Sequence, residues 1–96
     1  MYIITVRYEW DERKRLSNLE KHGLDFLDVG IVFESPHIEV PSSHGSEKRF
    51  LAIGAIEGRF VTVVCTMRND AIRVISFRRA RHEERDAYQK LYGSRA

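Results

Sequence analysis

The sequence predicts an α+β fold, in which a twisted, mainly antiparallel sheet carries two helices from the N-terminal part and one from the C-terminal part. Residues 47–56 and 59–68 are rich in β-branched and apolar side chains, and Glu57-Gly58 between them is typical of a two-residue hairpin turn. Asp11 and Gly23 suit the N-cap and the left-handed C-terminal position of a helix. With 96 residues, 43% of them hydrophobic and 31% charged, the chain is expected to form one globular domain over its whole length.

The N-terminal elements are a strand and a helix. Residues 2–9 have the β-branched and aromatic content of a strand. A helix is expected from Asp11 to about His22, where Leu16 and Leu19 form a narrow apolar stripe. We therefore expect this helix to lie on the surface of the sheet.

A second, shorter helix is expected directly after the first. Asp25 can cap it, and Phe26, Val29 and Phe33 follow at roughly helical spacing. Pro36 lies just past its end, where a helix cannot continue.

The remaining elements are strands and a final helix. Residues 37–40 are a candidate short strand, and 41–46 are expected to form a mobile loop because Pro, Ser and Gly dominate there. Residues 72–77 have the composition of a strand. Residues 82–92 are helix formers, with acids in the first turn and Lys90 in the last, which complements the helix dipole.

Hairpin register predicts which side chains share a face of the sheet. The turn at Glu57-Gly58 places Ile53 opposite Thr62, and a three-residue loop at 69–71 would place Thr66 opposite Val74 and Thr62 opposite Arg78. The longer loop is preferred because a two-residue loop would turn Arg78 into the core. The predicted apolar face comprises Phe50, Val61, Val63, Cys65, Met67, Ile75 and Phe77. The predicted polar face comprises Arg49, Thr62, Thr66, Arg68, Ser76 and Arg78.

Charge is distributed unevenly along the chain. Residues 1–48 hold six Lys or Arg against nine Asp or Glu, whereas 49–96 hold ten against five, and nine of those ten are arginine. Arginine makes forked hydrogen bonds to phosphate oxygens. The C-terminal half is therefore predicted to bind an anionic partner, with nucleic acid the first candidate.

Several other classes of protein are disfavoured. Cys65 is the single cysteine, so no intrachain disulfide can form, and a buried structural thiol is the favoured interpretation. The four histidines show no metal-ligand spacing, and no apolar run approaches the ~18 residues of a membrane span. A cytoplasmic protein without a metal or a cofactor is expected.

Cleavage of RNA without a metal requires a base for the 2′-hydroxyl proton, cations for the phosphate and an acid for the leaving 5′-oxygen. Glu84 is a candidate base, Arg68 and Arg78 are candidate phosphate stabilisers, and Tyr88 or His22 is a candidate acid. Each has a structural alternative. Glu84 could pair with neighbouring arginines, Tyr88 could be a packing residue, and His22 could be a cation at a helix C-terminus.

A set of short motifs in a fixed order resembles the BrnT family of bacterial type II toxins. The motifs are Glu9-Trp10-Asp11, residues 18–26, Phe33, residues 47–54, Gly58-Arg59, Thr66-Met67-Arg68, residues 72–80 and residues 84–88. Two positions depart from the family pattern, since Phe77 stands where a small residue is common and Cys65 where an aromatic residue is common.

The resemblance implies a RelE-like fold and a metal-independent endoribonuclease that arrests translation. It also implies a BrnA-like ribbon–helix–helix antitoxin, a heterotetramer with that antitoxin, and contact with operator DNA only through it. The implied catalytic residues are Arg68, Arg78, Glu84 and Tyr88. The implied substrate-binding residues are Arg49, Lys21 and His22, the last two with helix termination as an open alternative. A non-catalytic RNA-binding protein, or a co-repressor partner of a DNA-binding antitoxin, is the alternative function.

Overall fold

A computed structural model of the chain describes residues 6–93 and has the predicted α+β architecture. Five strands form one sheet in the order β1-β5-β4-β3-β2, in which only the β1–β5 pair is parallel. The elements in chain order are β1 (Tyr8–Glu9), α1 (Glu12–His22), a 3-10 turn (Phe26–Asp28), α2 (Val29–Glu34), β2 (Ile38–His44), β3 (Glu47–Ile56), β4 (Arg59–Arg68), β5 (Ala71–Arg79) and α3 (His82–Tyr92). The strand predicted at 2–9 thus falls partly outside the described residues, and Tyr8–Glu9 are its observed part.

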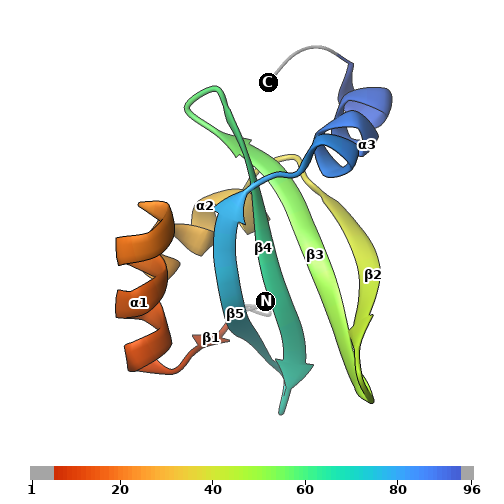
Figure 1. The fold of residues 1–96 in the computed structure, drawn as a ribbon. Coiled ribbons are helices and arrows are strands. Elements are labelled where there is room, and N and C mark those ends of the chain that lie inside the picture. Colours follow the sequence, from red (N-terminus) through yellow and green to blue (C-terminus); the bar gives the residue numbers. More distant parts are fainter. Residues whose placement is uncertain (1–5, 94–96) are drawn as a thin grey trace, which may run out of the picture.

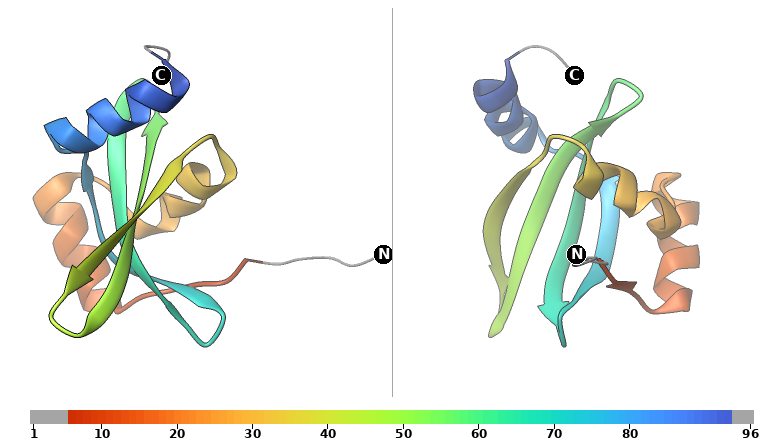
Figure 2. Two further views of the ribbon diagram at one scale, coloured as in Figure 1. Left: turned by 90° about the vertical axis from the view of Figure 1, so that its right-hand side faces the viewer. Right: turned by 180° about the vertical axis from the view of Figure 1, so that it is seen from behind.

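The helices occupy different sides of the sheet (Figures 1 and 2). α2 lies behind the sheet, α3 crosses the upper part of its front, and α1 flanks the β5 edge. The lower front of the sheet between α1 and α3 carries no helix (Figure 1). This arrangement leaves one face open between two helical walls.

The predicted ends of α1 are confirmed. The Asp11 carboxylate accepts hydrogen bonds from the backbone N–H groups of Arg13 and Lys14, at 2.8 and 3.3 Å. Gly23 has φ +70°, and its N–H donates to the Leu19 carbonyl at 2.8 Å. The apolar stripe is weaker than expected, because Leu16 is 53% exposed. Caps therefore define this helix more than burial does.

Asp25 was predicted to cap the second helix, and it caps instead the 3-10 turn that leads into α2, whose own N-cap residue is Asp28. The Asp25 carboxylate accepts from the Leu27 N–H at 3.0 Å and from the Arg15 guanidinium at 3.0 and 3.1 Å. The Leu27 hydrogen bond and the Arg15 cation lower the pKa of Asp25. Because Arg15 belongs to α1, the ion pair ties the two helical segments together.

The expected mobile loop at 41–46 is wrong, since Pro41 to His44 belong to β2 and only Gly45-Ser46 form the turn. β2 is an edge strand that pairs with β3 alone, and an edge is where a proline without an N–H is tolerated. The serine-rich composition thus marks an exposed strand rather than a loop.

The second hairpin loop was also predicted wrongly. Asn69 and Asp70 form a two-residue turn with φ +51° and +64°, so that Arg68 lies opposite Ala71 and Thr66 opposite Arg73. A β-bulge with one extra residue in β5 then shifts the register between Cys65 and Val64. The bulge restores the predicted pairing of Val64 with Ser76 and of Thr62 with Arg78.

The core lies between the back of the sheet and the segment from the 3-10 turn to α2. Its buried residues include Phe26, Val29, Val32, Val61, Val63, Cys65 and Phe77. Gly54 permits this packing, because a Cβ there would lie 3.2 Å from Cγ1 of Val32. Two residues assigned to the apolar face are exceptions: Met67 is 58% exposed, and Ile75, the extra residue of the bulge, lines a depression beside Ser76.

Candidate nucleic-acid interface

Two adjoining depressions occupy the open face between α1 and α3. One, of about 390 Å³, is lined mainly by α1, and the other, of about 250 Å³, lies over β2–β5. They share Ile75 and Ser76, and we call them together the basic groove. Its charged or titratable lining residues are Arg13, Lys14, Lys21, His22, His44, Arg49, Arg78 and Arg81. None of the lining residues is acidic, so the groove suits a polyanion.

Asn18 fixes the α1 wall of the groove against β5. Its amide nitrogen donates to the carbonyls of Phe77 and Leu24 at 2.8 and 3.0 Å. Its amide oxygen accepts from the Phe77 N–H at 3.1 Å and from the Ser76 hydroxyl at 3.3 Å. Because β1, in the part of the chain that the structure describes, pairs with β5 at Ile72 and Arg73 alone, Asn18 takes the place of a strand neighbour at Phe77. One neutral side chain thus positions the cations of α1 beside the sheet.

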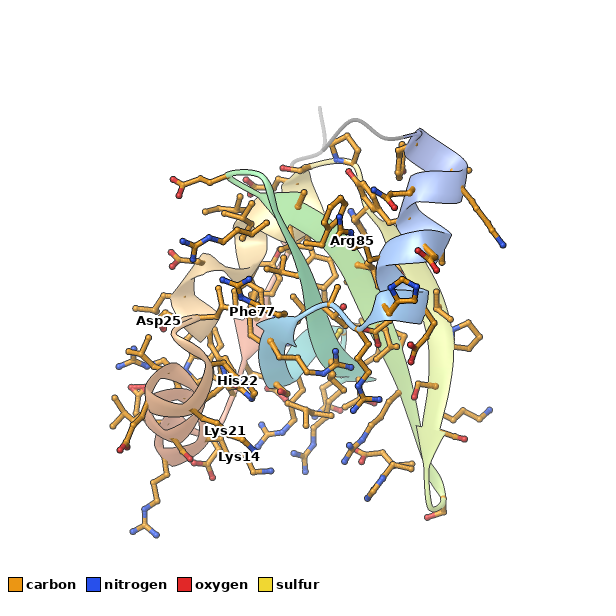
Figure 3. All side chains as sticks on the ribbon, turned by 45° about the horizontal axis from the view of Figure 1, so that its top comes forward. Lys14, Lys21, His22, Asp25, Phe77 and Arg85 are labelled. Atoms are coloured by element: carbon orange, nitrogen blue, oxygen red, sulfur yellow. The ribbon has the colours of Figure 1, made fainter. Side chains whose placement is uncertain are left out.

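Three basic residues of α1 lie on the side of the helix that faces β5. Lys14, Lys21 and His22 are labelled there in Figure 3, and all three line the α1 depression. Burial lowers the pKa of His22, and the positive charges of Lys21 and Arg78 lower it further. His22 is therefore mainly neutral at pH 7 and can accept a proton as a neutral imidazole.

Arg78 on β5 and Glu84 on α3 form a two-pronged ion pair. The Arg78 Nη1 and Nη2 donate to the two carboxylate oxygens of Glu84 at 2.8 and 3.0 Å. Glu84 also accepts from the Thr62 hydroxyl at 2.9 Å and from the backbone N–H of Arg81 at 2.8 Å. Strand register brings Thr62 opposite Arg78, so the sheet assembles this cluster and α3 supplies its anion.

Glu84 is consequently stabilised as an anion. Burial disfavours the charge, but the hydrogen bonds from Arg78, Arg81 and Thr62 outweigh it and lower the pKa of Glu84 to about 2. A carboxylate with so low a pKa is a weak base, because general bases work best with a pKa near the working pH. The geometry favours Glu84 as the group that holds Arg78 in place.

Tyr88 lies one turn after Glu84 and is 5% exposed. Its ring meets Phe60 edge-on, with centroids 5.7 Å apart, and lies beside Tyr92 with centroids 4.9 Å apart. These contacts are those of a residue that packs α3 onto the sheet.

The other two predicted arginines occupy different places on the same face. Arg49 lines the groove with Arg78, although it also pairs with Glu47 at 2.7 Å. Arg68 lies six residues from Thr62 along β4, roughly 20 Å away at the rise of a strand. It lines a separate depression with Glu47 and Arg73, so the predicted meeting of three arginines is reduced to Arg49 and Arg78.

Other kinds of site have little support among residues 6–93. No three His, Cys, Asp or Glu side chains in that range gather as a metal site requires, and no helix in it is long and apolar enough to cross a membrane. Cys65 is fully buried, and burial and the charge of Glu39 raise the pKa of its thiol to about 12. This thiol is not a nucleophile at neutral pH.

Comparison with known proteins decides the family. The family model described as "Ribonuclease toxin, BrnT, of type II toxin-antitoxin system" matches residues 10–84. The chain belongs to the BrnT family. The match includes α1, the whole sheet from β2 to β5 and the start of α3 up to Glu84.

A solved BrnT structure has the same arrangement. The crystal structure of the Brucella abortus ribonuclease toxin BrnT, at 1.1 Å, is 34% identical in sequence and has a TM-score of 0.64. The superposition covers 81% of this chain and 100% of that chain. No curated protein matches the chain.

Sequence reasoning missed several residues of the groove. Asn18 opens the motif at residues 18–26, but no role was predicted for it, because an asparagine inside a helix is ordinarily a surface residue and its bonds to Phe77 span 59 positions. No role was predicted for Arg13 and Lys14, although they recur with Ser17 and Lys21 at helical spacing along the face that lines the groove.

Proposed function

We propose that this BrnT-family chain is a metal-independent endoribonuclease that cleaves RNA bound in the basic groove. The carrying observation is the position of Arg78. Glu84 holds its guanidinium in a depression that also contains Arg49 and Arg81. His22 lies close enough to Arg78 for the charges of these two residues to interact. We propose a RelE-like scaffold and a cytoplasmic location as well, on the resemblance of the motifs.

The proposed roles follow from the charge of each side chain and from its ability to exchange a proton. Arg78 would stabilise the negative charge that grows on the phosphate as the 2′-oxygen attacks the phosphorus and the 5′-oxygen leaves. Arg49, Lys21 and the other cations of α1 would hold neighbouring phosphates. His22, neutral at pH 7, could take the 2′-hydroxyl proton, and its protonated form could return one to the 5′-oxygen.

The family resemblance implies catalytic roles for Glu84, Tyr88 and Arg68, and these roles stay predictions. The contacts of each residue favour a different role. Glu84 fits a positioning role better than that of a base, because its carboxylate already accepts four hydrogen bonds. Tyr88 fits packing better than acid catalysis, and Arg68 fits a distal phosphate contact.

The second candidate function is an RNA-binding protein that blocks translation without cleavage, or a co-repressor of its partner. The observation that favours it is the pKa of Glu84, about 2, which leaves the groove without a carboxylate poised to act as a base. The two functions predict the same RNA affinity and opposite outcomes for RNA integrity.

We further propose a BrnA-like ribbon–helix–helix antitoxin as the protein partner, in a heterotetramer that contacts operator DNA only through the antitoxin. The groove supports this proposal, because acidic antitoxin side chains bound to Arg49, Arg78 and Arg81 would exclude RNA. An antitoxin that neutralises the toxin while leaving the groove accessible to RNA would contradict it.

The deciding experiment incubates the purified chain with single-stranded RNA in EDTA. Fragments should appear with wild type and should fall on the order of 10²-fold in rate with Arg78→Ala. Lys90→Ala is the matched control, since Lys90 is an exposed cation at the other end of α3. RNA that is bound but not cut would establish the second candidate, and cleavage that requires added divalent metal would overturn metal independence.

A further inference from the structure

A second cluster of arginines lies outside the basic groove. Arg59, Arg79 and Arg85 line a depression of about 200 Å³ between the β3–β4 hairpin and the start of α3. We call it the hairpin arginine cluster. Its other lining residues are Gly58, Phe60 and Ala80, so none of the six is acidic.

The side chains of the three arginines make no ion pair among residues 6–93. Each of the three is exposed. Arg79 follows Arg78 on β5, and successive strand side chains point to opposite faces, so the two residues serve different depressions. The free energy of three neighbouring cations is raised by their mutual repulsion unless an anion joins them.

One member of the cluster is held in position. The Arg85 guanidinium carbon lies 4.8 Å from the centre of the Phe60 ring, and the side chain projects from α3 towards the hairpin (Figure 3). A stacked guanidinium keeps its N–H donors free at the edge of its plane. Arg85 therefore presents an ordered hydrogen-bonding edge to a ligand in the depression.

The cluster is continuous with the basic groove through α3. Arg81 lines the groove, Arg85 lines the hairpin arginine cluster, and residues four apart on a helix are neighbours on its surface. The backbone N–H of Arg85 donates to the Arg81 carbonyl at 2.9 Å, which confirms that the helical turn is formed. The basic groove and the hairpin arginine cluster thus form one band of positive charge around the start of α3.

We propose that the hairpin arginine cluster binds a phosphate group of the RNA strand, outside the nucleotides held at Arg78. The choice of RNA as the ligand rests on the proposed function, whereas the anion site itself does not. A nucleic acid strand presents one negative charge every few ångströms, which suits a continuous band of arginines. An acidic protein segment is a poorer match, because protein interfaces have an apolar centre and the aromatic ring in this depression is covered by Arg85.

The site can be tested first without RNA. In a titration with inorganic phosphate at constant ionic strength, the arginine Nε–H NMR signals of Arg59, Arg79 and Arg85 should shift together and saturate. The double variant Arg59→Ala/Arg79→Ala should abolish the shift of the Arg85 signal, whereas Lys90→Ala should leave it intact. Shifts that are absent, or linear without saturation, would overturn the site.

The second arm uses a fully 2′-O-methylated single-stranded RNA, which the chain can bind but not cut. The Arg59→Ala/Arg79→Ala variant should bind about fivefold more weakly at about 0.1 M salt, and the slope of log K against log salt should be smaller by about 0.7, as expected for one lost phosphate contact. Lys90→Ala should retain the wild-type slope.

The outcomes separate the two proposals. An unchanged RNA affinity and slope, with weaker binding of poly-glutamate instead, would assign the cluster to an acidic protein partner and overturn the RNA assignment. If the methylated strand binds as expected but unmodified RNA is never cut, the proposed ribonuclease activity fails while the phosphate site stands.

Discussion

The two walls of the basic groove are built on opposite electrostatic principles. The α1 wall is anchored by a neutral amide, Asn18, and its cations Lys14 and Lys21 make no ion pair among residues 6–93. The α3 wall is anchored by a carboxylate, Glu84, which neutralises the arginine it positions. A neutral anchor leaves charge available for a ligand, whereas a charged anchor fixes one guanidinium accurately and reduces its net charge. The α1 wall is therefore suited to attract RNA and the α3 wall to orient one phosphate.

The largest effect is expected at the charged anchor. Arg78→Ala leaves Glu84 buried without its cation, which should lower the free energy of unfolding by roughly 3 kcal/mol as well as slow cleavage. Arg78→Lys should recover part of the stability but little of the rate, because an ammonium cannot make the forked contact. Chemical denaturation measured beside cleavage checks both, and combining Arg78→Ala with Glu84→Gln should recover stability. A double variant as unstable as Arg78→Ala would show that the ion pair is not the cause.

The neutral anchor should be nearly as sensitive. Asn18→Ala removes the side-chain partners of the Phe77 N–H and carbonyl, and an unsatisfied buried polar group costs about 1–3 kcal/mol. We expect a loss of roughly 2 kcal/mol in denaturant unfolding, together with weaker RNA binding because α1 is no longer fixed. Ser17→Ala, at the neighbouring exposed position, should change stability by less than about 0.5 kcal/mol.

The two anchors should differ in their response to acid. The pKa of Glu84 is about 2 in the folded chain against an ordinary 4.5, so the stability that it contributes is complete above about pH 4.5 and is lost as the pH falls towards 2. The melting temperature of wild type should therefore fall more steeply than that of Glu84→Gln between those values. Asp25 and Glu12 also have lowered pKa values, and subtracting the two curves removes their contribution. Parallel curves would contradict the assignment. Glu84→Gln also tests the catalytic prediction, because a base would lose about 10²–10⁴-fold in rate.

The sequence predicted the helix and hairpin boundaries around the groove better than the side-chain contacts that line it. Turn and cap residues such as Gly23 and Glu57-Gly58 act on their immediate neighbours, so the helix α1 and the hairpin β3–β4 were predicted correctly. The bulge at Ile75 depends on packing between strands and has no local signature, and the predicted loop length was wrong for that reason. The saturation of Glu84 by Thr62 and Arg78 likewise joins residues up to 22 apart.

A smaller effect is expected from the free cations of α1. Lys21→Ala should weaken RNA binding about fivefold at about 0.1 M salt through one lost phosphate contact. The exposed side chain makes no ion pair among residues 6–93, so stability should change by less than about 0.5 kcal/mol. Fluorescence anisotropy at several salt concentrations measures the effect, with Lys90→Ala as the control. Equal losses for both variants would indicate that overall charge, not the groove, governs binding.

The smallest effect is expected at Tyr88. Tyr88→Phe keeps the edge-on contact with Phe60 and the neighbouring ring of Tyr92, so the cleavage rate and the melting temperature should both stay close to wild type. A rate that falls tenfold at unchanged melting temperature would identify the Tyr88 hydroxyl as the acid. The proton donor would then lie on α3, in place of His22 on α1.

Pro41 also limits how the sheet can associate with other chains. β2 is the exposed edge of the sheet over seven residues, and such an edge can pair with a strand of another molecule and grow into an aggregate. A proline in the middle of that strand has no N–H to offer, so a continuous ladder cannot form there. Pro41, which made this segment resemble a loop, therefore hinders strand pairing at this edge. Other molecules are then left to bind the sheet through the side chains on its faces.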